Sequence, residues 1–468
     1  MQKLATKTRR EKVPTCTKSS LCNFVPSSSW QIYSIMEMEH LYQLYLQHPH
    51  VQTDSRKLKE GEIFFALKGP NFNGNAFAVR AIELGASYVI VDEPVEVHDP
   101  RIILVPDVLN SLQQLAKYHR GQFDKLPGGG IPFIAITGSN GKTTTKELIH
   151  QVLSRKYITY TTEGNLNNHI GIPLTLLKVR MDAQVVVIEM GANHLKEIRD
   201  YCTYANPTHG LITNCGKAHL EGFGSVEGVR KGKGELYDHL RANKGTVFVN
   251  ANDQVLLEMA KGIPEIIYYG DRNGSIKTVP DKEDSFVTVS LDGFTKPIHS
   301  RLVGNYNLHN ILAAIAIGEY FKVPKEQIQN AIEQYIPSNS RSQLVKVGTN
   351  TFIMDAYNAN PSSMRSAIEN FAAMKVAGDK ILLLGSMMEL GKDSGAEHKD
   401  IVRLIDQYQW GSVALVGEGF KSISDHYLVF ENAYQVRNWL DQQQVEHATL
   451  LVKGSRSMEM ENVLSPQD

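Results

Sequence analysis

A glycine-rich run at residues 137–144 carries the residue types that most directly suggest chemistry. It reads Thr-Gly-Ser-Asn-Gly-Lys-Thr-Thr, after an apolar stretch expected to be a strand and before a segment expected to be a helix. Gly138 and Gly141 let backbone N–H groups turn inward around phosphate oxygens, and the helix N-terminus adds its dipole. Lys142 can reach the β- and γ-phosphates, and the Thr143 hydroxyl can ligate Mg²⁺.

The run therefore predicts binding of a nucleoside triphosphate with Mg²⁺. It departs from the usual phosphate-loop pattern at one position, because the first glycine of that pattern would fall on Ile136. Taken alone, it does not distinguish a kinase, a switch GTPase, a transporter ATPase or a ligase.

Four further residues could complete such a site. Glu189 ends the apolar run 185–188, and the carboxyl ends of parallel strands are where open α/β folds bind ligands. A carboxylate there suits a second Mg²⁺ ligand. His219 follows another expected strand, where it could ligate metal, contact substrate or simply lie on the surface. Lys231 and Lys233 begin a later helix and could bind phosphate or be solvated.

Length and composition limit the classes of protein that need be considered. The chain has 468 residues, enough for about three domains at roughly 100–200 residues each. Lys plus Arg number 49 and Asp plus Glu 50, so no global field favours nucleic acid or an anionic membrane as the main partner. The four cysteines show no CxxC spacing, which argues against a zinc site or a disulfide scaffold. No apolar run approaches the roughly 20 residues that span a bilayer, so no membrane insertion is expected.

The segment at residues 1–35 differs from the rest, because it is basic, rich in Ser and Thr and without hydrophobic periodicity. It lacks the apolar core of a secretory signal. Three interpretations stay open: an organelle transit peptide, a disordered tail, or a wrongly chosen start with Met36 or Met38 as the true one.

The remaining chain divides into three expected α/β domains. Short β-type runs around one helical stretch favour a small domain at residues 36–127, and a Pro-Gly-Gly-Gly linker ends it. Apolar runs that alternate with helices predict a central phosphate-loop domain with a mostly parallel sheet at residues 128–337. The alternation restarts in a Rossmann-like domain at residues 338–468.

These motifs, taken together, resemble the Mur ligase family, ATP-dependent amide-forming enzymes of peptidoglycan precursor synthesis. The resemblance covers roughly residues 38–468. It implies that Thr143 and Glu189 hold one Mg²⁺, and that His219 and a carbamylated Lys233 hold a second. Lys142, Lys233, His219 and Glu189 are the implied catalytic residues.

Five runs resemble more narrowly the members that join D-alanyl-D-alanine to UDP-N-acetylmuramoyl-tripeptide. They lie at residues 54–69, 164–173, 355–364, 385–391 and 453–456. The first implies that the N-terminal domain binds the uridine nucleotide. There are departures from the family pattern: Asn73-Gly74-Asn75 stands for Asp-Gly-His, Tyr306 for a more usual His, and Ser386 for Asp.

The resemblance also implies the binding residues. Those expected at ATP are Gly138, Ser139, Asn140, Gly141, Lys142, Thr143, Thr144, Asn307, Asn310, Arg341 and Asp355. Those expected at the other substrates are Ser55, Arg56, Asn165, Asn167, Asn168, Tyr357, Asn358 and Asn360. The amides of Asn307 and Asn310 suit an adenine edge, which needs a donor and an acceptor, although Asn307 could instead cap a helix. A cytoplasmic monomer that acts on small molecules, with ATP and Mg²⁺, is expected.

Other functions give different expectations. A tripeptide-forming relative would carry an Asp-Asn-Pro-type motif in the third domain, and none is found. A folylpolyglutamate-type ligase would lack the N-terminal uridine domain. A catalytically idle, regulatory homologue predicts damage at Lys142, Glu189, His219 or Lys233, and none is damaged.

Overall fold

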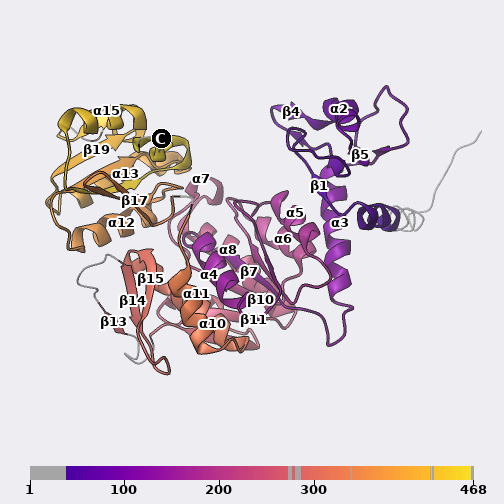
Figure 1. Ribbon diagram of the computed structural model, residues 1–468, viewed down its shortest axis with the longest axis horizontal. Helices are drawn as coiled ribbons and strands as arrows, with labels where there is room; N and C mark the ends of the chain where they lie inside the picture. The colour runs from indigo at the N-terminus through magenta and orange to yellow at the C-terminus, as the bar shows by residue number, and fades with distance from the viewer. Residues whose placement is uncertain are drawn as a thin grey trace, which may run out of the picture.

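A computed structural model shows an α/β chain with mostly parallel sheets, as the sequence predicts (Figure 1). The structure describes residues 38–271, 277–279, 286–338, 340–421, 423 and 426–464. The segment at residues 1–35 therefore lies outside the described residues. Among the described residues, no helix is both long and apolar enough to span a bilayer.

The first part of the chain forms a small parallel sheet with strand order β1-β2-β5-β6. Its strands are β1 (Val51–Gln52), β2 (Ile63–Phe65), β5 (Tyr88–Val91) and β6 (Ile102–Leu104). Helix α2 (Ala78–Glu83) follows a 3-10 turn, η1 (Gly74–Phe77), and packs on β5. β3 (Lys68–Gly69) and β4 (Phe72–Asn73) form a separate short hairpin.

Helix α3 (Val108–Phe123) connects this small sheet to the central part of the chain. Its N-terminus is capped by Asp107, whose side chain accepts from the Asn110 N–H at 2.6 Å. Along its length α3 packs against two helices of the central part, α5 (Gly171–Lys178) and α6 (Glu197–Ala205). The buried Arg120 holds it there, because its guanidinium lies 3.8 Å over the Phe133 ring.

The central sheet has six parallel strands in the order β12-β11-β10-β7-β9-β8. They are β7 (Phe133–Thr137), β8 (Thr159–Thr161), β9 (Val185–Glu189), β10 (His209–Ile212), β11 (Thr246–Asn250) and β12 (Glu265–Tyr269). The inner strands β7, β9 and β11 are buried throughout, which explains their continuous apolar runs.

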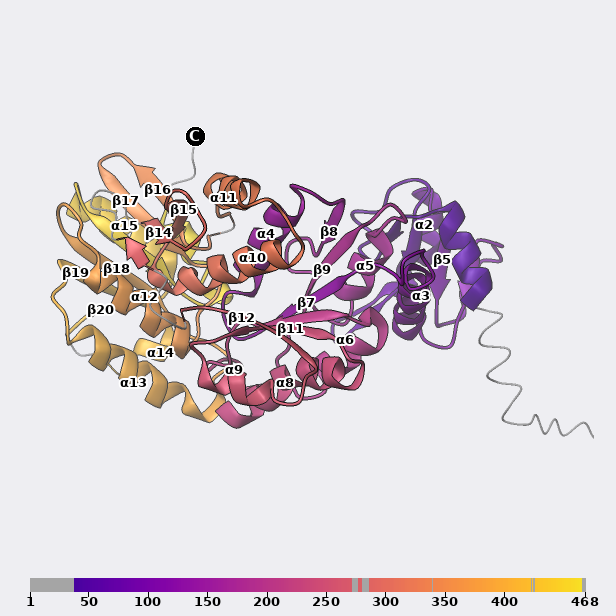
Figure 2. The same cartoon turned by 90° about the horizontal axis from the view of Figure 1, so that it is seen from below.

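Helices cover both faces of this sheet (Figure 2). One face carries α4 (Lys142–Leu153), α10 (Leu308–Tyr320) and α11 (Lys325–Gln334). The other carries α5, α6 and α8 (Val226–Ala242), and the short α7 (Leu220–Phe223) and α9 (Gln254–Met259) lie beside it. The phosphate loop therefore lies at the carboxyl edge of β7, between two helical layers.

The expected alternation of strands and helices over residues 128–337 is wrong in one region. The strands β13 (Lys277–Val279), β14 (Phe286–Ser290) and β15 (Ile298–Val303) form an antiparallel sheet of their own. In β15 the buried residues Ile298, Ser300 and Leu302 alternate with exposed ones, the period of a half-buried strand. That period was a usable signal, because the parallel strands show continuous apolar runs instead.

The last part of the chain forms a six-stranded sheet with strand order β16-β17-β21-β18-β19-β20. It is parallel except for the edge strand β16, which pairs antiparallel with β17. Its strands are β16 (Gln343–Val347), β17 (Asn350–Asp355), β18 (Lys380–Gly385), β19 (Ser412–Val416), β20 (Leu428–Phe430) and β21 (Thr449–Lys453). Its helices are α12 (Pro361–Ala373), α13 (Ser394–Ile405), α14 (Glu418–Lys421) and α15 (Ala433–Gln443).

Candidate active site

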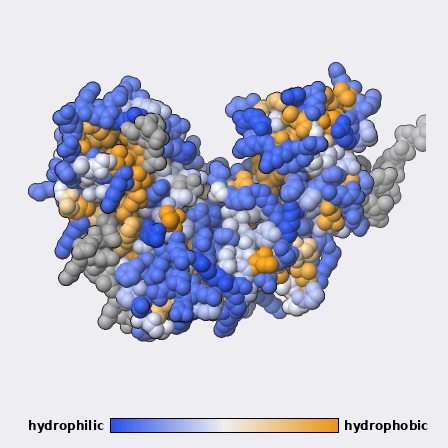
Figure 3. All heavy atoms as spheres, in the orientation of Figure 1, coloured by the Kyte–Doolittle hydropathy of each residue, from blue (hydrophilic) through white to orange (hydrophobic). Residues whose placement is uncertain are grey.

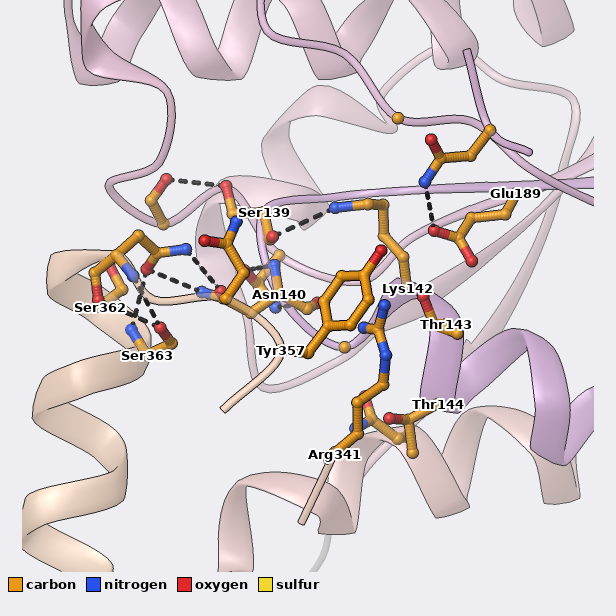
Figure 4. A pocket seen from close by; sticks show the side chains of 18 of the residues that line it. Ser139, Asn140, Lys142, Thr143, Thr144, Glu189, Arg341, Tyr357, Ser362 and Ser363 are labelled. Atoms are coloured by element: carbon orange, nitrogen blue, oxygen red, sulfur yellow. Dashed lines mark hydrogen bonds between the residues drawn. The ribbon is translucent and has the colours of Figure 1, made fainter. Parts of the chain in front are cut away.

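A cleft of about 590 Å³ lies where the central part of the chain meets the last part. Figure 4 shows the phosphate loop on one side and side chains of the last part facing it. Most of the residues expected in the site line this cleft. They are Ser139, Asn140, Gly141, Lys142, Thr143, Thr144, Asn167, Asn168, Glu189, His219, Asn307, Asn310, Arg341, Asp355, Tyr357, Asn358 and Asn360.

The phosphate loop needs glycine at both positions, and each glycine lies against a different neighbour. Gly138 has φ +142°, and a Cβ atom there would come within 2.0 Å of the Thr213 Oγ1. Gly141 has φ +80°, and a Cβ atom there would lie 2.6 Å from the Asn310 Oδ1. The loop can therefore take this path only with glycine at both positions, because the backbone turns tightly against its neighbours.

Lys142 is held inside the loop. Its ammonium donates to the carbonyl oxygens of Gly138 at 2.7 Å and Ser139 at 3.2 Å. Burial lowers the pKa of the lysine, and Arg341 lowers it further, whereas Glu189 acts in the opposite direction. A phosphate group in the loop would favour the charged form of this amine, because it would supply the missing anion.

Glu189 ends β9 with an unpaired oxygen. The side chain is 1% exposed, and Oε1 accepts from the Asn167 amide at 2.7 Å (Figure 4). Oε2 is buried and has no hydrogen-bond partner among the residues that the structure describes. A buried carboxylate oxygen without a partner is costly, and a hard cation such as Mg²⁺ would satisfy it.

The protein groups around Glu189 fit such a cation only if phosphate oxygens of the substrate supply further ligands. Thr143, at the start of α4, is 3% exposed and lines the same cleft. Among the described residues, no three His, Cys, Asp or Glu side chains gather closely enough to hold a metal by themselves. A hydroxyl, one carboxylate and phosphate oxygens together would form the hard-oxygen set that Mg²⁺ prefers.

His219 contacts the last part of the chain. Its Nδ1 lies 2.5 Å from the Oε2 of Glu389. Both residues have left-handed backbone, with φ +51° at His219 and φ +60° at Glu389. His219 lines the cleft, so this contact joins its rim to the 385–391 motif.

Lys233 does not line the cleft. It lies midway along α8, which begins at Val226, so the expectation that it stands at a helix start is wrong. Its side chain is fully buried, and its Nζ donates to the Ala192 carbonyl at 2.8 Å. Burial, with a contribution from Lys142, lowers the pKa of Lys233 to about 7. The neutral amine is the form that reacts with CO₂, and Ala192 itself lines the cleft.

Asn307 and Asn310 form a buried hydrogen-bonded pair at the start of α10. The Asn310 Nδ2 donates to the Asn307 Oδ1 at 2.9 Å, and the Thr145 hydroxyl donates to the Asn310 Oδ1 at 3.0 Å. The Asn307 side chain makes no capping bond to the helix. The alternative that the Asn307 side chain caps the helix is therefore wrong, because its Oδ1, the atom that would accept from a backbone N–H, accepts from the Asn310 amide instead.

The last part of the chain adds a cation and a paired carboxylate. The Arg341 guanidinium stacks 3.5 Å from the centre of the Tyr357 ring (Figure 4). Asp355 accepts from the Lys453 Nζ at 2.6 Å, and Lys453 is 2% exposed. Lys453 also lines the cleft but was missed as a site residue, although the Lys-Gly-Ser-Arg run directly after a strand was the available signal.

Polar contacts fix this part of the chain to the phosphate loop. The Asn360 amide donates to the Asn140 Oδ1 at 2.7 Å, and Asn360 also caps α12 by accepting from the Ser363 N–H. The Ser362 hydroxyl accepts from the Lys217 N–H at 2.8 Å. Ser362 was another missed residue, because its role depends on a contact between distant segments.

Five expected residues do not line the cleft. Ser55 and Arg56 lie in the first part of the chain, where the exposed Arg56 pairs with Asp54 at 2.9 Å. Asn165, Gly138 and Lys233 belong to the central part but stay outside the lining. Figure 3 shows the first and last parts of the chain separated by an open hollow above the central part.

The fold and site together define a three-part α/β protein with a phosphate loop that faces a second α/β unit across a cleft. Family models match each part: the Mur ligase family catalytic domain at residues 49–120, the Mur ligase middle domain at 136–318, and the Mur ligase glutamate ligase domain at 340–456. The chain belongs to the Mur ligase family.

Curated relatives and solved structures point to one branch of that family. The chain is 33% identical to the UDP-N-acetylmuramoyl-tripeptide–D-alanyl-D-alanine ligase of Bacillus subtilis, over 88% of this chain and 92% of that one. The same ligase of Escherichia coli is also 33% identical, with the same coverage. A crystal structure of MurF from Acinetobacter baumannii is similar with a TM-score of 0.78 and 30% identity, over 88% of this chain and 92% of that one.

Proposed function

We propose that this protein is an ATP-dependent ligase that joins D-alanyl-D-alanine to UDP-N-acetylmuramoyl-tripeptide. One observation carries the proposal: a single cleft brings the phosphate loop and Glu189 against Tyr357 and Asn360 of the last part of the chain. A ligase that uses ATP must bind the phosphoryl donor and the acceptor carboxylate next to each other in one cleft. The similarity to ligases of this name over most of the chain supports the same function.

The phosphate loop would bind ATP, with Lys142 and Arg341 at the phosphates. Transfer of the γ-phosphoryl group to a carboxylate brings anions together, so cations must neutralise them. Lys142 lies inside the loop, and Arg341 lines the cleft next to it. Ser139, Asn140, Gly141 and Thr144 would complete the phosphate side. Asn310 would lie toward the adenine, and Asn307 would hold it there through their hydrogen bond.

Mg²⁺ would be held by Thr143 and Glu189, and a second ion by His219 and the carbamate of Lys233. When bound, Mg²⁺ neutralises charge on the phosphates during transfer. The unpaired Oε2 of Glu189 supports the first assignment. The pKa of Lys233, lowered to about 7, supports its conversion to a carbamate, because the neutral amine attacks CO₂.

The reaction would proceed through an acyl phosphate. The terminal carboxylate of the tripeptide attacks the γ-phosphorus, ADP leaves, and the dipeptide amine then attacks the activated carbonyl carbon. Collapse of the tetrahedral adduct releases inorganic phosphate and leaves the new amide. An acyl phosphate must be kept from water, and the contacts between Asn140 and Asn360 close one side of the cleft.

The remaining substrate groups would spread over all three parts of the chain. Tyr357, Asn358 and Asn360 would place the dipeptide, and Asn167 and Asn168 the end of the peptide stem. Asn165, Ser55 and Arg56 would act farther along the UDP precursor. We also propose domain limits at residues 36–127, 128–337 and 338–468, a monomer, and action in the cytoplasm on small-molecule substrates.

The test is phosphate release from ATP and Mg²⁺ with UDP-N-acetylmuramoyl-tripeptide, with and without D-alanyl-D-alanine, and with the product identified by mass spectrometry. Release that requires both substrates and gives the pentapeptide precursor is expected. Lys142→Met should abolish it, and the matched control Lys231→Met on the exposed face of α8 should not. Turnover only with a single amino acid and the dipeptide precursor would assign the tripeptide-forming ligation instead. ATP binding without turnover on either stem would favour a regulatory protein.

A further inference from the structure

Tyr306 lies in the central part of the chain and contacts the last part across the cleft. It lies in the 3-10 turn η2 (Asn305–Asn307), just before α10, and it lines the cleft. Its hydroxyl is 3.0 Å from the Ser342 Oγ. Ser342 precedes β16, so this hydrogen bond joins the nucleotide-binding part of the chain to the part across the cleft.

The Ser342 hydroxyl also accepts a hydrogen bond from a second side chain of the central part. The Asn307 Nδ2 donates to the Ser342 Oγ at 3.1 Å and to the Val303 carbonyl at 2.8 Å. Ser342 is 4% exposed and has φ +51°, a backbone conformation that residues other than glycine rarely adopt. Two hydrogen bonds to one buried hydroxyl hold it in that conformation.

The hydrogen bonds continue to the phosphate loop. Both amide hydrogens of Asn307 are used by Val303 and Ser342, so Asn307 has no N–H left for a nucleotide. Its Oδ1 accepts from Asn310, whose own Oδ1 accepts from Thr145 in the first turn of α4. Side chains thus connect the helix that begins at the phosphate loop with Ser342.

Arg341 directly precedes Ser342 in the chain. The hydrogen bonds that hold Ser342 would therefore also fix the position of Arg341. Its Nε is buried and has no hydrogen-bond partner within the described part of the chain, and its guanidinium stacks on Tyr357. The Tyr357 N–H in turn bonds to the Ser340 carbonyl at 3.3 Å. The backbone at Ser340 also has a positive φ, +53°. The direction of the Arg341 side chain therefore depends on how both flanking serines are held.

We propose that Tyr306 and Ser342 are positioning residues that align Arg341 with the terminal phosphate of a nucleotide in the loop. The inference rests on the proposed binding of ATP, and it deepens that function. It also gives Asn307 a role in the network, between Asn310 and Ser342.

The experiment is a double-mutant cycle on the full-length protein, read by equilibrium binding of a non-hydrolysable ATP analogue and of ADP, each with Mg²⁺. Tyr306→Phe should weaken analogue binding about three- to tenfold, the range expected for one lost hydrogen bond. Ser342→Ala removes two hydrogen bonds and should weaken it at least as much. ADP binding should change less, because ADP lacks the phosphate that Arg341 would meet. In an Arg341→Ala background, neither substitution should weaken analogue binding further.

Matched controls separate this role from general damage to the fold. Tyr157→Phe removes a hydroxyl that donates to the Phe321 carbonyl at 2.6 Å, elsewhere in the central part, and should leave both affinities unchanged. Equal weakening of ADP and the analogue, or effects that add fully to Arg341→Ala, would overturn the proposal. If Tyr306→Phe does not fold, Ser342→Ala completes the same cycle. A wild-type protein that binds nucleotide but forms no pentapeptide would overturn the ligase function alone, since the binding cycle stays readable.

Discussion

The Oε2 of Glu389 lies 2.5 Å from the Nδ1 of His219, although the two residues are far apart in the sequence. This contact is supported by the bond from the Glu221 N–H to the Glu389 carbonyl at 3.1 Å. The contact with His219 holds the pKa of the Glu389 carboxyl below its usual value. The 385–391 motif thus contributes the acid that orients a residue on the rim of the cleft.

Replacement of Glu389 by alanine should slow turnover more than it destabilises the fold. The Glu389 side chain is 48% exposed, so its ion pair contributes at most about 1 kcal/mol to the free energy of unfolding. A misplaced His219 should nevertheless lower kcat about tenfold, because small displacements of catalytic groups are costly. Steady-state kinetics and urea unfolding of one preparation would measure both. Glu418→Ala, which breaks an exposed pair with Lys421, is the control. Equal kcat values for the two variants would contradict the expectation.

Replacement of Glu189 by glutamine should weaken the response of the protein to Mg²⁺. The buried Oε2 has no hydrogen-bond partner among the described residues, and an amide at that position is a much weaker ligand for a hard cation. With nucleotide present, Mg²⁺ should raise the Tm of the wild-type protein more than that of the variant, whose remaining rise would come from the second proposed ion. We expect kcat to fall at least about 10²-fold, the scale of losing charge stabilisation in the transition state. The exposed Glu163→Gln is the matched control, and an equal rise of Tm with Mg²⁺ in Glu189→Gln and the wild type would exclude this ligand.

Much of the fold could be predicted because its parallel strands are buried on both sides. The inner strands β7 and β9 show uninterrupted apolar runs, and such runs are visible in a single sequence. The antiparallel strands β13–β15 were missed, because the prediction relied on continuous apolar runs, whereas β15 alternates buried and exposed residues. The cleft residues that follow strand ends were found, since strand ends gather at one edge of a sheet.

Residues whose role depends on contacts between distant segments could not be predicted in this way. Ser342 is one example, because nothing in its neighbourhood in the chain indicates that Tyr306 and Asn307 reach its hydroxyl. The burial of Lys233 behind Ala192 is another. The sequence predicts a solvated or phosphate-binding lysine at this position. Only the packing of the folded chain shows that the Lys233 amine is desolvated.

Lys233 should make activity depend on CO₂ in a pH-sensitive way. With a pKa of about 7, its amine is neutral above that pH and protonated below it. Bicarbonate should therefore stimulate CO₂-depleted enzyme one pH unit above this value and much less one unit below it. Native mass spectrometry should show the added mass of one CO₂, which acid removes. Lys233→Met should lack both effects, whereas Lys231→Met, two residues away and exposed, should keep them. An unmodified Lys233 in fully active enzyme would contradict the carbamate.

The same pKa fixes how Lys233 affects stability. Its value in the folded protein lies below the ordinary 10.5, so between about pH 7 and 10.5 the unfolded chain binds more protons than the folded one. The contribution of Lys233 to the free energy of unfolding should therefore rise with pH through this window, and Lys233→Met should remove that part of the rise. Urea unfolding of both proteins without bicarbonate, across the window, would measure it. Parallel curves for the two proteins would contradict the desolvated amine.

Arg120 should set how firmly the first part of the chain is held on the central part. Its guanidinium donates to the carbonyls of Ala205 at 3.0 Å and Asn206 at 2.9 Å, and it covers Phe133. Arg120→Ala would leave both carbonyls without a donor and a cavity beside the ring, for a loss of about 3–5 kcal/mol. Urea unfolding would measure this loss, and Arg80→Ala, in an exposed pair with Glu83, should change stability by less than about 1 kcal/mol.

A functional consequence separates this anchor from an ordinary core residue. If Arg120 fixes α3 on the central part, Arg120→Ala should expose the glycine linker at residues 128–130 to limited proteolysis before the rest of the chain is cut. The KM for the UDP-linked precursor should rise, because its two ends would bind to parts of the chain no longer held together. The KM for ATP should change little. Arg120 contacts Phe133 at the start of β7, whereas the phosphate loop follows the other end of this strand. A variant that loses stability but keeps both KM values and the protease pattern of the wild type would show that Arg120 stabilises the fold without orienting the substrate-binding parts.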